Sequence, residues 1–572
     1  MMSHNWSRSK FVDLMKAEPY LDLIHISLLI VIWILAALVV DPTGNFPLND
    51  DWAYASAVRA LVEQGELRLS GWTATNLIAQ LLWGAMFCLP FGFSFTALRI
   101  STLVLAILGI VATYALLREA QAKPGTALIG ALTLAFSPIY FALSYTFMTD
   151  VPFTAVTTAS SWLLVRGIRR GGLAEVAAGL ALAMTAILIR QIGLAIPIAF
   201  GVAYLAMRGL GFWRLVEAII PVSTGFAVQT AYQGWLHWLD RVPAKFGNQI
   251  ETLRMRLSLP WATIAGDATT IIFYTLVYTG FLLLPFLIVA HRASGRSRGC
   301  IFYFGAAGAA AVLTVTLKIH GTRMPLHPNI LTNGGIGWEL APAPGLLWLA
   351  VTFLGSFGAI LLVAGLIRAG LAFLTPSRIG FEAREPPVLV FAMAAIATTF
   401  APLPLLGLVG FGFYDRYLIV YLPWLMLLFA GTYRVPPSYG RCRTALVTGV
   451  AALVATATFS IMATHDYLAV HRVRWAALTD TMHRYRVGPE RIDGGFEFNG
   501  WYLYDDDYVR KPDKNWYWVL GDDYVVQLGS LRRNYEQLAE YPVDWWLPWS
   551  RGKVITQRRM IDVDPVVRDP NR

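Results

Sequence analysis

The stretch that decides the fold runs from Leu23 to Val40 and reads LIHISLLIVIWILAALVV. It contains no Asp, Glu, Lys or Arg. Backbone groups must be hydrogen-bonded inside a hydrocarbon layer roughly 30 Å thick, so a run of this length is typical of a transmembrane helix. It is long for the apolar core of a signal peptide, and no clear small-x-small cleavage site follows. We therefore expect it to be the first membrane span.

Similar apolar runs recur along the chain and predict about thirteen spans in all. These are residues 23–40, 100–117, 126–147, 151–165, 176–189, 191–207, 218–235, 268–290, 299–317, 346–367, 387–408, 417–433 and 444–464. Residues 72–91 are also apolar, but they include Asn76, Gln80 and Pro90. We expect this segment to be an interfacial or re-entrant helix and not a span.

The composition agrees with a polytopic α-helical membrane protein. Of 572 residues, 56% are hydrophobic and 14% are charged, against roughly 25% charged in soluble domains. Mean hydropathy is +0.53. These values exclude a soluble multidomain enzyme, a disordered chain and a collagen-like chain. The net charge of +10 does not indicate nucleic acid binding here, because Lys and Arg accumulate in cytoplasmic loops of membrane proteins.

Basic residues predict the orientation. If residues 72–91 do not cross the membrane, every basic cluster falls on one side, and the positive-inside rule makes that side the cytoplasm. The clusters are Arg8, Lys10 and Lys16; Arg118 and Lys123; Arg166, Arg169 and Arg170; Arg208 and Arg214; Arg292, Arg296 and Arg298; Arg368, Arg378 and Arg384; and Arg434, Arg441 and Arg443. We expect a bacterial inner-membrane protein with a cytoplasmic N-terminus and an outer C-terminus.

The composition changes at His465, after which Asp, Arg, Tyr and Trp become frequent. We predict a membrane domain over residues 1–464, with interfacial helices in its first outer loop (41–95). Residues 465–572 are expected to form a small soluble α/β domain on the outer face. Within it, residues 465–486 indicate a helix, and residues 492–498 and 524–528 indicate strands.

Acidic residues stand at the outer membrane edges. Asp50 and Asp51 are adjacent, Asp150 precedes Pro152, and Asp415 precedes Arg416. Paired carboxylates at an apolar boundary repel each other, so one of them should gain proton affinity, which suits a general base. The alternative is that these residues cap interfacial helices, since Asp is favoured at N-caps.

Cations are expected on the same outer face: Arg59, Arg99, Arg190, Lys318, His320, Arg323 and Arg416. Each one alone could simply reach a headgroup phosphate. Several that converge on one cavity would suit an anionic lipid headgroup. His320 and His327 do not have a standard metal-ligand spacing, and three isolated cysteines fit neither a disulfide framework nor a metal motif. We therefore predict no metal and no cofactor.

These motifs resemble the integral-membrane GT-C glycosyltransferases of the family 39/83 type, which include protein O-mannosyltransferases and aminoarabinose transferases. The resemblance lies in a first span followed by an acidic pair and Tyr54, in Leu98-Arg99, in Thr149-Asp150-Val151-Pro152 and in Tyr414-Asp415-Arg416-Tyr417-Leu418. It covers roughly residues 20–465. The Lys of the aminoarabinose branch is missing from the interfacial segment, which reads Gly71-Trp72-Thr73-Ala74-Thr75-Asn76.

The resemblance implies transfer of a sugar from a polyprenyl-phosphate donor to an acceptor on the outer face, with inversion and no obligatory metal. Asp50 would be the general base. Asp51 and Asp150 would orient the acceptor or the partners of Asp50. Cations would stabilise the leaving phosphate, with Tyr54, Asp415 and the seven basic residues named above as candidate substrate-binding residues.

Two other functions remain open. A transporter or flippase of a lipid-linked glycan would explain the spans and the outer cations, but it predicts charges deep in the membrane and repeated halves, which we do not find in the sequence. A non-catalytic subunit would predict that Asp50 is dispensable.

Overall fold

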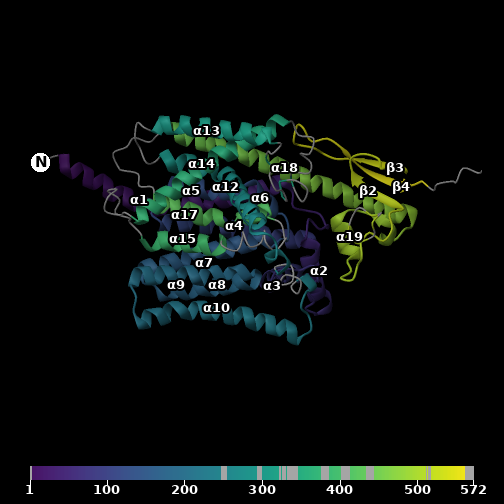
Figure 1. The fold of residues 1–572 in the computed structure, drawn as a ribbon, viewed down its shortest axis with the longest axis horizontal. Coiled ribbons are helices and arrows are strands. Elements are labelled where there is room, and N and C mark those ends of the chain that lie inside the picture. The colour runs from purple at the N-terminus through teal and green to yellow at the C-terminus, as the bar shows by residue number, and fades with distance from the viewer. Residues whose placement is uncertain are drawn as a thin grey trace, which may run out of the picture.

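The structure is a computed structural model, and it is mostly helical (Figure 1). It describes residues 3–245, 254–292, 299–320, 324, 330–331, 336, 345–374, 386–400, 413–432, 443–510, 512, 514 and 517–560. Every predicted apolar run contains a helix in the part that the structure describes. The predicted fold class, a helical membrane protein with a small C-terminal domain, is confirmed.

The first half of the chain forms ten α-helices and one short 3₁₀ helix among the described residues. They are α1 (Ser3–Val40), α2 (Asp51–Gln64), α3 (Ile78–Cys88), α4 (Phe95–Glu119), α5 (Pro124–Ala135), α6 (Pro138–Leu143), α7 (Asp150–Arg170), α8 (Leu173–Ile189), η1 (Gln191–Leu194), α9 (Ala195–Arg208) and α10 (Phe212–Trp238). The described parts of the second half contain α12 (Trp261–Arg292), α13 (Gly299–Ile319), α14 (Gly345–Leu374), α15 (Pro386–Phe400), η2 (Asp415–Leu418), α17 (Tyr421–Thr432) and α18 (Arg443–Tyr485).

Among the residues that the structure describes, seven helical segments are long and apolar enough to cross a membrane. They are Pro19–Val40, Phe95–Glu119, Gln191–Arg208, Trp261–His291, Phe302–Ile319, Gly345–Leu374 and Thr444–Tyr485. The larger number of thirteen spans therefore stays a prediction. Helix α3 has 11 residues and a length of about 16 Å, too short for a 30 Å layer, which agrees with the interfacial or re-entrant helix expected for residues 72–91.

The apolar pattern predicted one continuous helix over residues 126–147, and this prediction is wrong. The run is divided into α5 and α6 at Phe136 and Ser137. Pro138 occupies the first turn of α6, where its missing N–H costs no hydrogen bond, whereas inside a helix it would remove one. An apolar pattern does not reveal such a break.

Helices α4 and α7 pack side by side. They are parallel, because Gly109 lies beside Ala155 and Glu119 lies beside Arg169, and this defines two ends of the bundle. At one end, Glu119 accepts ion pairs from Arg169 at 2.7 Å and Arg170 at 3.0 Å. At the other end, α4 begins beside the first outer loop, where the Phe95 N–H donates to Asn45 Oδ1 at 3.0 Å. Two of the predicted basic clusters thus lie together, at the end opposite the acidic motifs.

The contact between α12 and α14 depends on small residues. A Cβ atom on Gly280 would lie 2.2 Å from the backbone nitrogen of Ala359, and one on Gly358 would lie 2.1 Å from the carbonyl oxygen of Gly280. Small residues at such crossings let two helix backbones approach closely inside a membrane. Larger side chains at these two positions would force α12 and α14 apart.

Helix α18 leads without a break from the helical layers to the C-terminal sheet (Figure 1). The sheet has the order β1-β2-β4-β3, with β1 (Ile492–Asp493), β2 (Tyr524–Leu528), β3 (Tyr535–Pro542) and β4 (Lys553–Arg559). Strand β1 is parallel to β2, and the other pairs are antiparallel. The helix predicted at 465–486 and the strand at 524–528 are present.

The strand predicted at residues 492–498 is wrong in its second half. Strand β1 has only two residues, and α19 (Phe496–Leu503) follows it. Gly494 and Gly495 separate the two elements, and Gly495 has a φ of +88°, a left-handed conformation that glycine adopts at little cost. The glycine pair ends the strand and allows the chain to turn into a helix.

Candidate active site

Asp50 lies at the start of α2, directly after Asn49, whose φ is +56°. Its carboxylate makes no capping hydrogen bond to its own helix. Instead, the Trp72 indole Nε1 donates to Oδ1 at 2.9 Å, and Arg416 lies 3.2 Å from Oδ2. The side chain keeps 18% of its surface exposed, so it is held in place but remains accessible.

Asp150 forms a second ion pair at the start of α7. Arg190 Nη2 lies 2.9 Å from Asp150 Oδ1, and Arg190 Nε donates to the Thr149 hydroxyl at 2.8 Å. Arg190 occupies the extended residue between α8 and η1, which turns its side chain out of the regular helix. The Asp150 side chain is fully buried, and neither of its oxygens has a well-formed hydrogen bond from the described residues; the contact with Arg190 is an ion pair only.

The two ion pairs belong to one cluster. The Tyr417 ring centroid lies 6.0 Å from the Arg190 guanidinium and 5.8 Å from that of Arg416. Burial alone would lower the pKa of Arg416, but the carboxylates of Asp150 and Asp50 outweigh it and raise the pKa well above its usual value. Arg416 is therefore a permanent cation between the two carboxylates.

Tyr54, one turn after Asp50 on α2, belongs to the same cluster. Burial raises the pKa of its phenol strongly, the Asp50 carboxylate adds to that effect, and Arg416 and Arg190 act against it. The hydroxyl stays protonated at every physiological pH. It can serve as a hydrogen-bond donor but not as a base.

Asp51 organises the loop and does not join the ion pairs. Its carboxylate is buried and accepts the backbone N–H of Leu48 at 2.6 Å and that of Phe147 at 3.1 Å. Burial raises the pKa of Asp51 to about 7, although Arg99 and the two backbone donors oppose the rise. The sequence predicted a raised proton affinity from repulsion within the carboxylate pair, but the rise at Asp51 comes from burial and the charge of Glu497, and not from Asp50. Its contacts favour a structural role.

Arg99 supports the same loop from below. It donates to the backbone carbonyls of Pro42 at 3.2 Å, Gly44 at 2.6 Å and Phe46. It lies 4.2 Å from the Phe46 ring and is 1% exposed. The structure thus uses Arg99 to hold the first outer loop, and it does not place the side chain beside Asp50.

The remaining predicted residues lie apart from the cluster. Arg59 is exposed on α2, pairs with Glu63 at 2.9 Å and contacts the Trp501 ring. Asp415 is buried and accepts the backbone N–H groups of Ile330 at 3.0 Å and Leu331 at 2.9 Å, so its carboxylate holds these two residues in place.

Lys318 and His320 are exposed at the C-terminal end of α13. Arg323 lies outside the described residues. For these three residues the structure adds nothing in favour of a substrate-binding role.

Two residues that the sequence analysis did not select, Trp72 and Lys245, lie at the site. Lys245 Nζ is 3.1 Å from the centroid of the Trp72 ring, whose nitrogen donates to Asp50. Burial lowers the pKa of Lys245 to about 8, while the Asp50 carboxylate opposes the shift. Lys245 follows α10 in a loop that the predicted topology places outside, so its position was a usable signal. Its contact with Trp72, which lies 173 positions earlier, could not be predicted from the sequence.

The C-terminal domain packs directly over this site. Trp52 lies among aromatic rings of that domain, 5.1 Å from Tyr504 and 5.2 Å from Trp518 between ring centroids. A Cβ atom on Gly500 would lie only 2.4 Å from the Trp52 indole, so a larger residue has no space there. Glu497 accepts the backbone N–H of Asn49 at 3.3 Å, one residue before Asp50.

The described residues contain no group of three His, Cys, Asp or Glu side chains that could hold a metal ion. The expectation that the reaction needs no metal stays a prediction. The site combines one accessible carboxylate, one buried carboxylate and three cations, which are Asp50, Asp150, Arg190, Lys245 and Arg416.

Residues 77–238 match the family model of the dolichyl-phosphate-mannose-protein mannosyltransferases. This segment matches a GT-C glycosyltransferase family. It extends from α3 to the end of α10 and contains Asp150 and Arg190, while Asp50, Lys245 and Arg416 lie outside it. The resemblance that the motifs indicated is therefore confirmed for residues 77–238.

Solved structures are also similar to the chain over most of its length. ArnT from Cupriavidus metallidurans is 16% identical in its apo state, with 92% of this chain and 97% of that chain covered and a TM-score of 0.37. Its structure bound to undecaprenyl phosphate is 15% identical, with 93% and 97% covered and a TM-score of 0.38. The archaeal oligosaccharyltransferase AglB from Archaeoglobus fulgidus is 16% identical, with 86% and 61% covered and a TM-score of 0.43. No curated protein matches the sequence.

Proposed function

We propose that this protein is an integral-membrane glycosyltransferase that moves a sugar from a polyprenyl-phosphate donor to an acceptor hydroxyl on the outer face of the membrane. The observation that carries the proposal is the position of Asp50. It is an accessible carboxylate, oriented by Trp72 and Arg416, at the end of the bundle opposite the Glu119 cluster.

Asp50 is suited to accept a proton. A carboxylate offers about four acceptor sites on its two oxygens. Trp72 occupies one site on Oδ1 and two N–H groups of Arg416 occupy those on Oδ2, so a site on Oδ1 remains for the acceptor hydroxyl. Asp150 is fully buried against Arg190 and is less suited to this role. Its negative charge instead fixes the position of Arg190.

Arg190, Arg416 and Lys245 are suited to stabilise the leaving phosphate. Arg190 and Arg416 flank the Tyr417 ring, and Lys245 lies on the Trp72 ring beside Asp50. Guanidinium groups bind phosphate through paired hydrogen bonds, whereas a lysine acts as a point charge. Lys245 would thus supply the cation that the interfacial segment lacks at residues 71–76.

The proposed step is a single displacement. The acceptor oxygen forms a bond to the anomeric carbon while its proton passes to Asp50, and the bond from that carbon to the phosphate oxygen breaks. The electron pair leaves with the polyprenyl phosphate, whose charge the three cations stabilise. One displacement inverts the anomeric configuration. The match of residues 77–238 to a mannosyltransferase family supports this class of reaction.

The test is sugar transfer in vitro by the full-length protein in lipid nanodiscs, with radiolabelled polyprenyl-phosphate sugars and a mixed envelope-glycan acceptor fraction. Asp50→Asn keeps the size of the side chain but cannot take the proton, so we expect a loss of about 10²–10⁴ in turnover. Glu66→Gln is the matched control, because Glu66 is an exposed carboxylate of the same outer loop, paired with Arg68 at 2.9 Å.

Equal turnover of Asp50→Asn and wild type would remove Asp50 as the base. Movement of the labelled lipid across the bilayer without any transfer of its sugar would favour the transporter function. Repeating the transfer assay with a chelator tests the predicted independence from metal.

A further inference from the structure

The C-terminal domain contains a pocket of about 230 Å³ beside the end of β2. It is smaller than the roughly 300–1,000 Å³ of sites for drug-sized ligands, so it has room for one small group. The pocket is lined by Arg474, Asp493, Gly495, Val526, Gln527, Leu528, Gly529, Ser530 and Arg532. None of these residues belongs to the site around Asp50.

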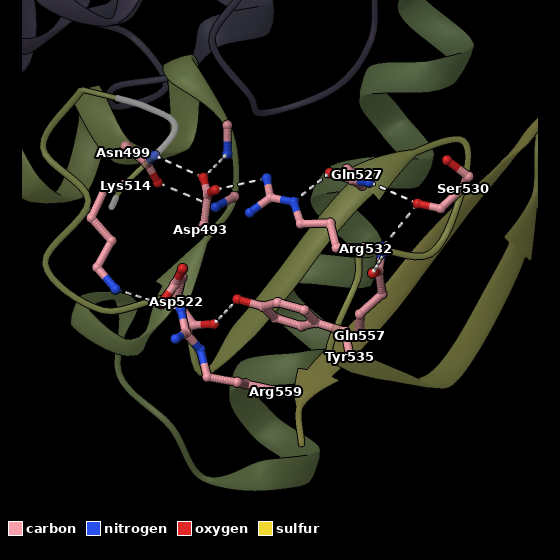
Figure 2. Close-up of polar contacts among 12 residues, drawn as sticks. Asp493, Asn499, Lys514, Asp522, Gln527, Ser530, Arg532, Tyr535, Gln557 and Arg559 are labelled. Atoms are coloured by element: carbon pink, nitrogen blue, oxygen red, sulfur yellow. Dashed lines mark hydrogen bonds and ion pairs between the residues drawn. The ribbon is translucent and has the colours of Figure 1, made fainter. Parts of the chain in front are cut away.

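The polar side chains of the pocket are fixed in a network. Figure 2 shows Arg532 between Asp493 and Gln527, with Nη2 2.9 Å from Asp493 Oδ2 and Nε 3.0 Å from Gln527 Oε1. Gln527 Nε2 donates to the carbonyl of Ser530 at 2.8 Å. Planar groups held in this way need little ordering when a ligand binds, which favours affinity.

Arg474 provides an unused donor. It is 4% exposed and lines the pocket, its Nη2 is paired with Glu497, and its Nε has no hydrogen-bond partner among the described residues. A buried donor without a partner costs free energy, and a ligand oxygen at this point would remove that cost. Gly495, with its φ of +88°, lies so close that a Cβ there would be 3.3 Å from Arg474 Nη1.

The charges of the pocket favour a neutral ligand. Arg474 is paired with Glu497 and Arg532 with Asp493, so two cations already face two carboxylates. An added anion would leave a negative excess in a partly buried site. A hydroxyl group can both accept from Arg474 and donate to the oxygens of Asp493 or Gln527. Val526 and Leu528 offer an apolar surface to the C–H face of a ring.

We propose that this pocket binds one neutral, polyhydroxylated sugar residue of the glycan acceptor. The assignment of that sugar to the acceptor rests on the proposed glycosyltransferase function. The pocket is connected to the reaction site, because Glu497, the partner of Arg474, also accepts the backbone N–H of Asn49 beside Asp50.

The first test measures binding alone, with the full-length protein in nanodiscs. Saturation-transfer NMR follows the methyl glycosides of mannose, galactose, glucose and N-acetylglucosamine, and inorganic phosphate serves as competitor. We expect saturable binding of at least one glycoside that phosphate does not reduce. Ser530→Trp should weaken it at least tenfold, because the exposed Ser530 side chain stands at the pocket and its carbonyl contacts are retained.

Gln527→Ala is the second variant, since it removes one side-chain partner of Arg532 without adding bulk and leaves the ion pair of Arg532 with Asp493. Lys553→Ala is the matched control: Lys553 is exposed on β4 and pairs with Glu540. Failure of all four glycosides to bind, displacement by phosphate, or unchanged binding in Ser530→Trp would each overturn the pocket.

The second test separates the pocket from the proposed function. In the transfer assay, Ser530→Trp should raise the acceptor KM and leave kcat and the donor KM unchanged. Glycoside binding without any transfer activity would contradict the proposed glycosyltransferase function, while it would still support the proposal that the pocket binds a sugar. Loss of glycoside binding with an unchanged acceptor KM would overturn the assignment to the acceptor.

Discussion

The Arg416 guanidinium lies 3.2 Å from the carboxylate of Asp50, although 366 positions separate the two residues in the chain. The contact joins the first outer loop to the short 3₁₀ helix before α17. The Arg416 guanidinium also interacts electrostatically with the Asp150 carboxylate. One side chain therefore connects Asp50 at the start of α2 with Asp150 at the start of α7.

Replacement of Arg416 should therefore reduce the rate of the proposed sugar transfer and leave the individual helices intact. We expect Arg416→Gln to lower turnover by about 10²–10³, the loss typical when one donor to a developing negative charge is removed. Arg416→Lys should recover part of the rate, because it restores the charge but not the paired geometry. The measurement is single-turnover transfer, with Arg68→Gln as the exposed control.

Thermal unfolding of the same Arg416 variants distinguishes catalysis from stability, since loss of a buried ion partner can cost about 3–5 kcal/mol. A double variant with Asp50→Asn should lose far less than the product of the single losses, because the two residues act as a unit. If the losses in turnover of the two single variants multiply in the double variant, Asp50 and Arg416 do not act as a unit.

Lys245 should make donor binding depend on pH. Its pKa is lowered to about 8, so the ammonium is present below pH 8 and is lost as pH rises through that value. Donor KM should therefore increase between about pH 7.5 and 9. Lys245→Arg keeps its charge and should remove this dependence, while Lys245→Met should show a raised KM at every pH. A wild-type KM that is constant over this range would contradict the prediction.

Asp51 should make stability decrease as pH rises. Its pKa is about 7 in the folded protein against 3.8 ordinarily, so the folded state binds the extra proton and is stabilised below about pH 4. This contribution, a few kcal/mol in size, is lost as pH rises to about 7. Thermal unfolding at pH 4.5, 6 and 8 should show the slope for wild type and for Glu66→Gln. A slope that persists in Asp51→Asn would assign the effect to another group.

The orientation can be tested with reporter fusions. Fusions after residues 125, 295 and 440 should report the cytoplasm, and a fusion at the C-terminus should report the outer side. The physical reason is the retention of Lys and Arg clusters in the cytoplasm. The meeting of Arg169 and Arg170 with Glu119, away from the Asp50 cluster, agrees with this arrangement. An outer location for residue 295 would contradict it.

Much of the helical fold could be predicted from the sequence because a membrane imposes long apolar runs, and most of the described helices of the bundle overlap these runs. Local breaks were less accessible. The division between α5 and α6 depends on Pro138, and the end of β1 depends on two glycines. Single residues of this kind change the backbone without changing the apolar pattern.

The site was predictable in its residue types but not in its pairings. Asp50, Asp150, Arg190 and Arg416 were all candidates, yet no sequence pattern says that Asp50 pairs with Arg416 and Asp150 with Arg190. Asp51 was also a candidate, but its partners are backbone N–H groups, which every residue except proline carries. Such partners leave no signal in a sequence.

Helix α18 has 43 residues and extends about 65 Å as one continuous rod. It carries the sheet at its far end and contains no proline that would kink it, and the contact of Trp52 with Trp518 holds the C-terminal domain over the site around Asp50. Under the proposed function, an acceptor would then reach Asp50 from the side of this domain. Enzyme turnover should accordingly survive a crosslink that locks the domain to the bundle.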